Sequence, residues 1–142
     1  MTVDRVRVEA FLTTLRDAVV VLRGYGALPQ VEFLASVDRR GSARYHLVVA
    51  AEAALDVGTH MISRCRWRTP RGYADVFLVL VENGALDPDL GQRLMRLAGL
   101  RNRLVHRYWD ADDGLIHAWL GEELDYLEHF IGAVARTLQG GG

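Results

Sequence analysis

The recurrence of apolar residues every three or four positions is the feature that most constrains how this chain can fold. Near the N-terminus one helical stripe is formed by Val8, Phe11, Leu12, Leu15, Val19 and Leu22. The chain has only three prolines, and runs of β-branched residues are short. Its 142 residues, 50% hydrophobic and 25% charged, suit one globular domain with a real core. We therefore expect an all-α fold: a single domain over residues 1–142, built as an antiparallel bundle of five or six helices.

Turn-forming residues divide this pattern into segments. We expect helices at about residues 4–23, 29–34, 39–64, 73–83, 88 into the segment after 100, and 120–138. Gly24 and Gly26 are expected to end the first helix, and Gly84 the fourth. The pair Asp87-Pro88 predicts a cap followed by proline in the first turn. Residues 109–114 are expected to form a turn.

Cysteine usage and hydropathy exclude several classes of protein. Cys65 is the sole cysteine, so an internal disulfide and zinc-finger spacings are both excluded. Residues 1–11 contain acidic side chains and no apolar run, unlike a signal peptide. The longest nearly uncharged stretch, residues 45–61, is too short and too polar to span a bilayer. We expect a cytoplasmic protein without membrane segments.

The basic residues are all of one kind. The chain has 17 of them and every one is arginine. Arginine carries a planar fork that binds phosphate or carboxylate at two points, whereas lysine is a point charge. A GC-rich genome produces the same bias, so this composition alone leaves the function open.

Residues 101–110, RNRLVHRYWD, carry the clearest chemistry. Histidine accepts a proton near neutral pH, and arginine holds a phosphate together with the charge that develops on it. His106 and Arg101 would therefore suffice for RNA cleavage without a metal, since a ribose 2′-hydroxyl can supply the nucleophile. An arginine-rich helix end facing water, with a capping histidine, is the alternative interpretation.

The spacing within this segment raises a geometric problem. Positions five apart on an α-helix differ by about 140°, so Arg101 and His106 cannot share a face. Either the helix is distorted here, or the side chains converge over its end, or two copies of the segment meet across a two-fold axis. The spacing does not choose among these.

In its context this segment resembles a known family. RNRLVHRY resembles the R-x4-H-x-Y signature of the HepT-like branch of the HEPN proteins. Residues 45–62 resemble the family's long central helix, and Pro70, Tyr73 and the segment 78–100 follow in the family's order. The resemblance covers nearly the whole chain.

This resemblance implies a fold, an activity and partners. HepT-like proteins are helical homodimers described as metal-independent ribonucleases, the toxins of bacterial toxin–antitoxin pairs. Their antitoxin is a nucleotidyltransferase resembling MntA, which transfers AMP to the motif tyrosine. Carried over, Arg101 and His106 are catalytic, Asn102 and Arg103 support them, and Tyr108 accepts AMP. No cofactor is implied. The alternative is a non-catalytic helical partner and acceptor protein for a nucleotidyltransferase.

Glu52, Asp56 and His60 recur at intervals of four and would form one polar line along the central helix. Three interpretations stay open: a structural role, a metal site, or acids that hold Arg101 or Arg103 by charge-assisted hydrogen bonds. The metal site is the least favoured, because such bundles need matching carboxylates from other helices.

The loop of residues 64–73 places arginines around a tryptophan. Arg66, Trp67 and Arg68 are candidate contacts to single-stranded RNA, by phosphate binding and base stacking. A solvated loop whose tryptophan covers the core is the more common outcome for such a sequence.

Overall fold

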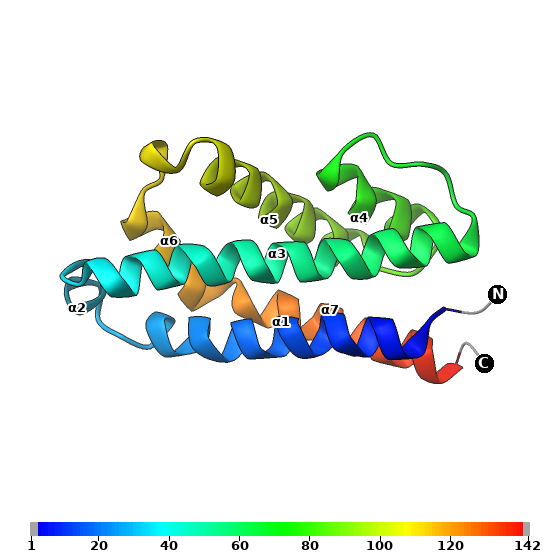
Figure 1. The fold of residues 1–142 in the computed structure, drawn as a ribbon, viewed down its shortest axis with the longest axis horizontal. Coiled ribbons are helices and arrows are strands. Elements are labelled where there is room, and N and C mark those ends of the chain that lie inside the picture. The colour runs from blue at the N-terminus through cyan, green and yellow to red at the C-terminus, as the bar shows by residue number, and fades with distance from the viewer. Residues whose placement is uncertain (1–2, 141–142) are drawn as a thin grey trace.

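The computed structural model describes residues 3–140, which contain seven α-helices, one short 3₁₀-helix and no strand. In chain order they are α1 (Arg5–Gly26), α2 (Gln30–Leu34), α3 (Val37–Cys65), α4 (Tyr73–Glu82), α5 (Pro88–His106), η1 (Tyr108–Asp110), α6 (Asp113–Glu122) and α7 (Leu124–Gly140). The predicted all-α fold class is confirmed (Figure 1). None of the helices described is long and apolar enough to cross a membrane.

The long helix α3 organises the bundle (Figure 1). It runs antiparallel to α1 along one side, and on its other side it contacts α4 and α5. Helix α7 packs against α1 and α5, while α2 contacts α6 and α3. The motif segment therefore leaves the bundle from the end of α5, beside the N-terminal half of α3.

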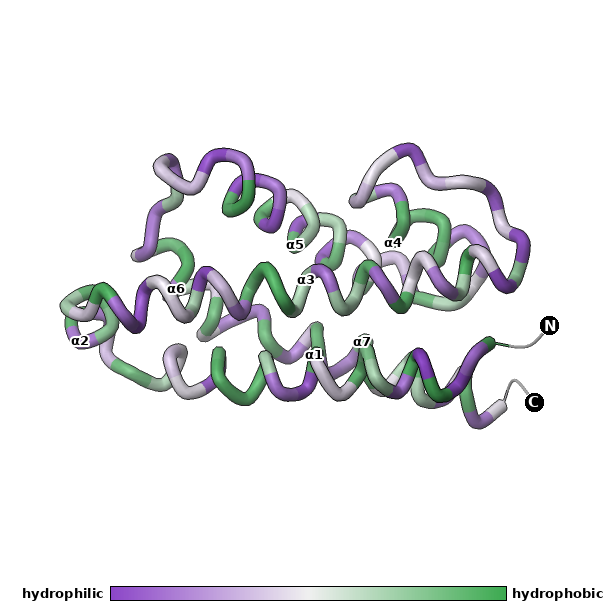
Figure 2. Tube along the Cα trace, in the orientation of Figure 1, coloured by the Kyte–Doolittle hydropathy of each residue, from purple (hydrophilic) through white to green (hydrophobic). Residues whose placement is uncertain are grey.

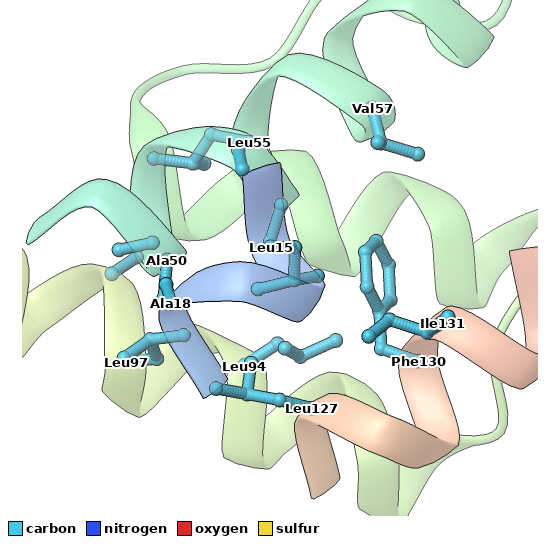
Figure 3. Close-up of a cluster of buried hydrophobic side chains, with 14 of the residues drawn as sticks. Leu15, Ala18, Ala50, Leu55, Val57, Leu94, Leu97, Leu127, Phe130 and Ile131 are labelled. Carbon is cyan, nitrogen blue, oxygen red and sulfur yellow. The ribbon is translucent and has the colours of Figure 1, made fainter. Parts of the chain in front are cut away.

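The core is formed by aliphatic side chains from all the long helices (Figure 3). Three phenylalanines are also buried. Phe77 of α4 and Phe130 of α7 meet edge to face, with ring centroids 6.2 Å apart. Small residues allow close approach around them. A Cβ added to Gly58 of α3 would lie 2.7 Å from the Val76 Cγ1 atom, and one added to Gly91 of α5 would lie 2.2 Å from the Val81 Cγ2 atom. Helix α4 is therefore wedged tightly against α3 and α5.

The sequence correctly predicted the end of α4 at Gly84 and the start of α5 at Asp87 and Pro88. Gly84 has a φ of 76°, and the Ala85 N–H donates to the Leu80 carbonyl, which closes α4 in a Schellman motif. The Asp87 carboxylate accepts from the Leu90 N–H at 2.9 Å, and Pro88 occupies the first turn of α5. Helix α5 is thus fixed from its first residue.

Helix α1 continues through Gly24 and ends at Gly26, so the prediction was wrong for Gly24 and is confirmed for Gly26. At Gly26 a tertiary contact also favours glycine. A Cβ there would lie 3.1 Å from the Leu120 carbonyl oxygen, so glycine is needed where α6 crosses α1. This glycine is the last residue of α1 and also allows the close contact with α6.

Helix α6 was not predicted. The expected last helix is present, but it begins at Leu124 rather than near residue 120. Residues 109–114 do not form a simple turn: Asp112 caps α6, its carboxylate accepting from the N–H groups of Gly114 and Leu115. Helix α6 ends at Glu122, with Glu123 as its C-cap, and α7 begins at Leu124. The aspartates of residues 109–114, which suggested a turn, instead include the residue that caps α6.

Candidate functional site

The motif occupies the last turn and a half of α5 and the connection that follows. Helix α5 is regular through His106, and it ends there because Arg107 leaves helical geometry, with φ −142° and ψ 46°. Tyr108 then begins η1. The helix that the sequence predicted to run from residue 88 into this segment therefore ends at His106. Figure 2 shows that this end of α5 is mostly hydrophilic, in contrast to the apolar residues nearer the bundle.

Arg101 is anchored at three points. Its Nη2 atom donates to the Glu52 Oε1 atom at 2.9 Å, and its Nη1 atom donates to the Asn102 Oδ1 atom at 3.0 Å. The guanidinium carbon lies 4.7 Å from the centre of the Tyr73 ring, a cation–π contact. Only 12% of the Arg101 side chain is exposed. Its orientation is therefore fixed before any ligand arrives.

The interpretation that an acid of α3 holds Arg101 is confirmed for Glu52. Asn102 also contacts Arg101, as the supporting role expected of it requires. The buried Nε atom of Arg101 has no hydrogen-bond partner among the described residues. The Nε–H is thus an unused donor on a guanidinium that is paired with a half-exposed carboxylate.

The other two residues of the polar line on α3, Asp56 and His60, form no hydrogen bond or ion pair with Arg101 in the part of the chain that the structure describes. The His60 Nε2 atom accepts the Asp4 N–H at 3.0 Å, at the start of α1. Burial lowers the pKa of His60, as does the charge of Arg64, so the imidazole is held neutral in this acceptor role. Burial raises the pKa of Asp56, with Glu52 adding repulsion. Within residues 3–140 no cluster of three or more His, Cys, Asp or Glu side chains forms a metal-binding arrangement.

His106 and Tyr108 are exposed, in contrast to Arg101. Tyr108 is 63% exposed, and its ring meets Trp109 edge to face with centroids 5.5 Å apart. Trp109 is itself 70% exposed. An imidazole and a phenol at the tip of α5 are therefore open to large ligands.

Arg44 of α3 fixes the chain just after the motif. Its Nε and Nη2 atoms each donate to Asp113 at 2.8 Å, and its Nη1 atom donates to the Tyr108 carbonyl at 2.9 Å. Arg40 adds a longer ion pair to Asp113 at 3.5 Å. The hydrogen bonds with Asp113 hold the pKa of Arg44 above its usual value. Sequence reasoning missed Arg44, because no local pattern links it to a tyrosine 64 residues away.

Arg103 lies away from Arg101. It lines a crevice of about 520 Å³ between α5 and α6, which Arg101, His106 and Tyr108 do not line. Arg101, Arg103 and His106 leave α5 in different directions, as their spacing on the helix requires.

The loop after α3 is only partly available to a ligand. Trp67 packs partly against the core, and Arg68 donates to both Asp75 and Glu82. Arg68, together with the Arg71 N–H, lowers the pKa of Asp75 to about 2. Arg66 ends α3 with a left-handed backbone, φ 56°. Of this segment only Tyr73 reaches Arg101.

The regularity of α5 removes one of the three arrangements left open by the sequence. Arg101 and His106 lie on one undistorted α-helix, so they leave it about 140° apart. A distorted helix is therefore excluded. Convergence over the helix end and pairing of two copies remain.

Comparison with known proteins gives consistent matches. The family model for ribonuclease HepT-like proteins matches residues 15–134. The tRNA nuclease HepT of Aphanizomenon flos-aquae is 30% identical over 81 residues, which cover 57% of this chain and 55% of that protein. The mRNA nuclease HepT of Shewanella oneidensis is 24% identical over 103 residues, 72% of this chain and 77% of that protein.

A solved structure shares the fold. The tri-AMPylated Shewanella oneidensis HEPN toxin, in complex with its MNT antitoxin, superimposes with a TM-score of 0.84 at 20% identity. The match covers 91% of this chain and 96% of that one. The arrangement of helices around α5 is therefore one that a HEPN toxin also uses.

Proposed function

The chain belongs to the HepT-like ribonuclease family, and from that premise we propose that it is the toxin of a toxin–antitoxin pair that acts in the cytoplasm. Its activity would be metal-independent RNA endonuclease cleavage, with Arg101 and His106 as catalytic residues. One observation at the tip of α5 carries this proposal. The guanidinium of Arg101 is held in place by Glu52 and Asn102, whereas the imidazole of His106 is exposed.

The proposed reaction is a transesterification followed by release. His106 takes the proton from a ribose 2′-hydroxyl, and the oxygen attacks the adjacent phosphorus. Arg101 stabilises the charge on the phosphoryl oxygens. The 5′-oxygen leaves with a proton from solvent water, and His106 afterwards returns its own proton to solvent. The products are a 2′,3′-cyclic phosphate and a 5′-hydroxyl. Asn102 supports this step by holding Arg101, and Arg103 supports binding of the RNA.

A homodimer would assemble the site. Because Arg101 and His106 leave one helix about 140° apart, their side chains point in different directions within a single copy. A two-fold axis near the tip of α5 would place Arg101 of one copy opposite His106 of the other. The exposed Val105, 40% accessible on this helix, is available for such a contact.

Tyr108 is the proposed point of control. A nucleotidyltransferase antitoxin would bring ATP, whose α-phosphorus the Tyr108 oxygen attacks as pyrophosphate leaves and the phenol proton is lost. The attached AMP adds bulk and a phosphate beside the arginines of α5, and so blocks RNA. The exposure of Tyr108 supports this, as does the complex of AMPylated HEPN toxin with antitoxin that shares the fold.

The test of the nuclease is cleavage of defined RNA by the purified chain in excess EDTA. We expect products ending in a cyclic phosphate, and loss of cleavage in Arg101→Ala and in His106→Ala. His129→Ala is the matched control, because that histidine is exposed on α7. Cleavage that needs added metal, or that survives both substitutions, would contradict the assigned roles.

The test of the shared site is to mix the two inactive variants. In a mixed dimer one of the two sites regains both Arg101 and His106, so random exchange should restore about a quarter of wild-type activity. No recovery after subunit exchange, checked by sedimentation of the dimers, would contradict pairing across the axis.

The non-catalytic alternative has its own readout. If the chain cleaves no RNA but carries whole AMP increments on Tyr108 after co-expression with its nucleotidyltransferase, it is an acceptor protein. Tyr108→Phe should abolish the increments in either case, as intact mass would show.

A further inference from the structure

A crevice beside the motif is unused by the proposed chemistry. It lies between the C-terminal half of α5 and α6, and residues 110–112 also line it. Its volume is about 520 Å³, within the roughly 300–1,000 Å³ usual for small-molecule sites. Leu100, Ile116 and Trp119 supply an apolar and aromatic floor. Leu115 at its edge is 68% exposed, so this apolar surface is uncovered.

The acids around this crevice are already engaged. Asp110 accepts from Arg107 at 2.9 Å, and Glu123 accepts from Arg93 at 2.9 Å. Asp112 caps α6 through the Gly114 N–H. Their charges are therefore offset by partners within the protein.

The two arginines of the crevice are not engaged. Within residues 3–140, the side chains of Arg96 and Arg103 form no ion pair or hydrogen bond with another residue. They stand seven positions apart on α5, on the same face and separated by roughly 10 Å along the axis. Two free guanidinium groups thus flank an aromatic floor, which is the combination that binds a phosphate beside a stacked base.

We propose that this crevice binds one nucleotide of the RNA strand, with the base against Trp119 and Leu115 and its phosphate between Arg96 and Arg103. This rests on the proposed ribonuclease function. The crevice is lined by Arg103 in the last turn of α5 and by Asp110 in η1, so a strand seated here lies near the tip of α5. The crevice would then choose the base next to the cleaved bond, whereas Arg101 and His106 act on any phosphate.

The binding test uses His106→Ala protein labelled with 5-fluorotryptophan. Each of the three tryptophans gives one ¹⁹F signal, and Trp119→Phe identifies that of Trp119. Titration with a short single-stranded RNA should shift the Trp119 signal and saturate. Combining Arg96→Ala with Arg103→Ala should weaken this binding by at least roughly tenfold, the loss of one or two charge-assisted contacts.

Arg16→Ala with Arg39→Ala is the matched control, since both arginines are exposed on other helices and the change in charge is equal. We expect it to bind RNA as the parent does. A shift confined to Trp67 or Trp109, or a Trp119 shift that both double variants weaken equally, would overturn the crevice as a specific site.

Two further measurements separate this proposal from the nuclease itself. In the active protein, the Arg96 and Arg103 double variant should raise KM roughly tenfold and alter kcat far less. Cleavage with an unchanged KM would support the proposed nuclease and contradict the proposed RNA site in the crevice. A Trp119 shift that depends on Arg96 and Arg103, in a chain that cleaves no RNA, would keep the crevice and contradict the nuclease.

Titration with AMP in place of RNA distinguishes the source of the nucleotide. We expect the same Trp119 shift at higher ligand concentration, because a mononucleotide offers one phosphate and no neighbouring contacts. Tighter binding of AMP than of RNA would overturn the assignment to the RNA strand.

Discussion

The two ends of α5 are built in opposite ways. At the N-terminal end Asp87 caps the helix, and Gly91 lies so close to α4 that a Cβ would stand 2.2 Å from the Val81 Cγ2 atom. At the C-terminal end Arg103 and His106 are exposed, and Tyr108 beyond them is 63% exposed. One end is fixed by packing, and the other presents polar groups. The fixed end determines the directions in which the free end points its side chains.

Within the C-terminal end of α5, the two proposed catalytic residues differ in how firmly they are held. Arg101 is fixed by Glu52, Asn102 and Tyr73, whereas His106 is exposed at the last residue of the helix. A group that stabilises developing charge works best when it is already oriented, because no reorganisation is then needed in the transition state. A base must instead reach a proton whose position depends on the substrate.

The sharpest test of this comparison is His106→Ala. Loss of a general base should lower the rate of RNA cleavage by about 10²–10⁴-fold. Because the side chain is exposed, the free energy of unfolding should change by less than about 0.5 kcal/mol. Cleavage assays and urea unfolding of the same preparation measure both. A large loss of stability would mean that this end of α5 is structural as well.

Gly91→Ala is the counterpart at the other end. The new methyl group would collide with Val81, whose branched side chain has few alternative rotamers. Overpacking costs about 1–3 kcal/mol, reduced by the roughly 1 kcal/mol that alanine gains in a helix. We expect a lower urea midpoint and unchanged kcat in the folded fraction. Gly99→Ala is the control, since nothing lies within 4 Å of a Cβ there.

The contrast also marks what the sequence could predict. The start of α5 follows from Asp87 and Pro88, whose effects are local, and the motif was recognisable from its residue types. The partner of Arg101 could be named as an acid of α3 because spacing placed Glu52 on a polar line. Tyr73 was placed in the family's order but not over Arg101, since only the folded loop brings it there.

What failed depended on contacts distant in sequence. The close contact of Gly26 with α6 could not be predicted, and α6 itself was not recognised because its cap resembled a turn. Arg44 carries no local signal, yet it holds the Tyr108 carbonyl and Asp113 together. Helix propensity and spacing do not report which helix will lie against which.

Arg44→Gln should therefore disturb the free end without touching its side chains. Losing the bonds to Asp113 and the Tyr108 carbonyl should loosen residues 107–113 and lower kcat for cleavage by roughly tenfold, as small displacements of reacting groups do. KM should change little, and AMP transfer to Tyr108 should slow as well. Hydrogen exchange of residues 107–113 measures the loosening.

Two controls separate positioning from general damage. Arg44→Lys keeps one of the contacts and should recover part of kcat. Asp113→Asn combined with Arg44→Gln should cost little more than either change alone, because both break the same contact. Additive effects, or an increase in KM with kcat preserved, would argue that Arg44 binds substrate instead.

The smallest expected effect is that of Asp87→Ala. The carboxylate accepts the Leu90 N–H at 2.9 Å and faces the positive end of the helix dipole, so its loss should cost about 1 kcal/mol of stability. Asp87→Ser retains the hydrogen bond without the charge and should recover most of this. Asp89→Ala is the control, because Asp89 is exposed in the first turn of α5 and its loss removes a charge but not the cap. Because Gly91 and the core still hold this end of α5, RNA cleavage per folded molecule should not change in any of the three. A fall in kcat that tracks the loss of the cap would show that the two ends of the helix are coupled, and that the tip is oriented by the cap as well as by packing.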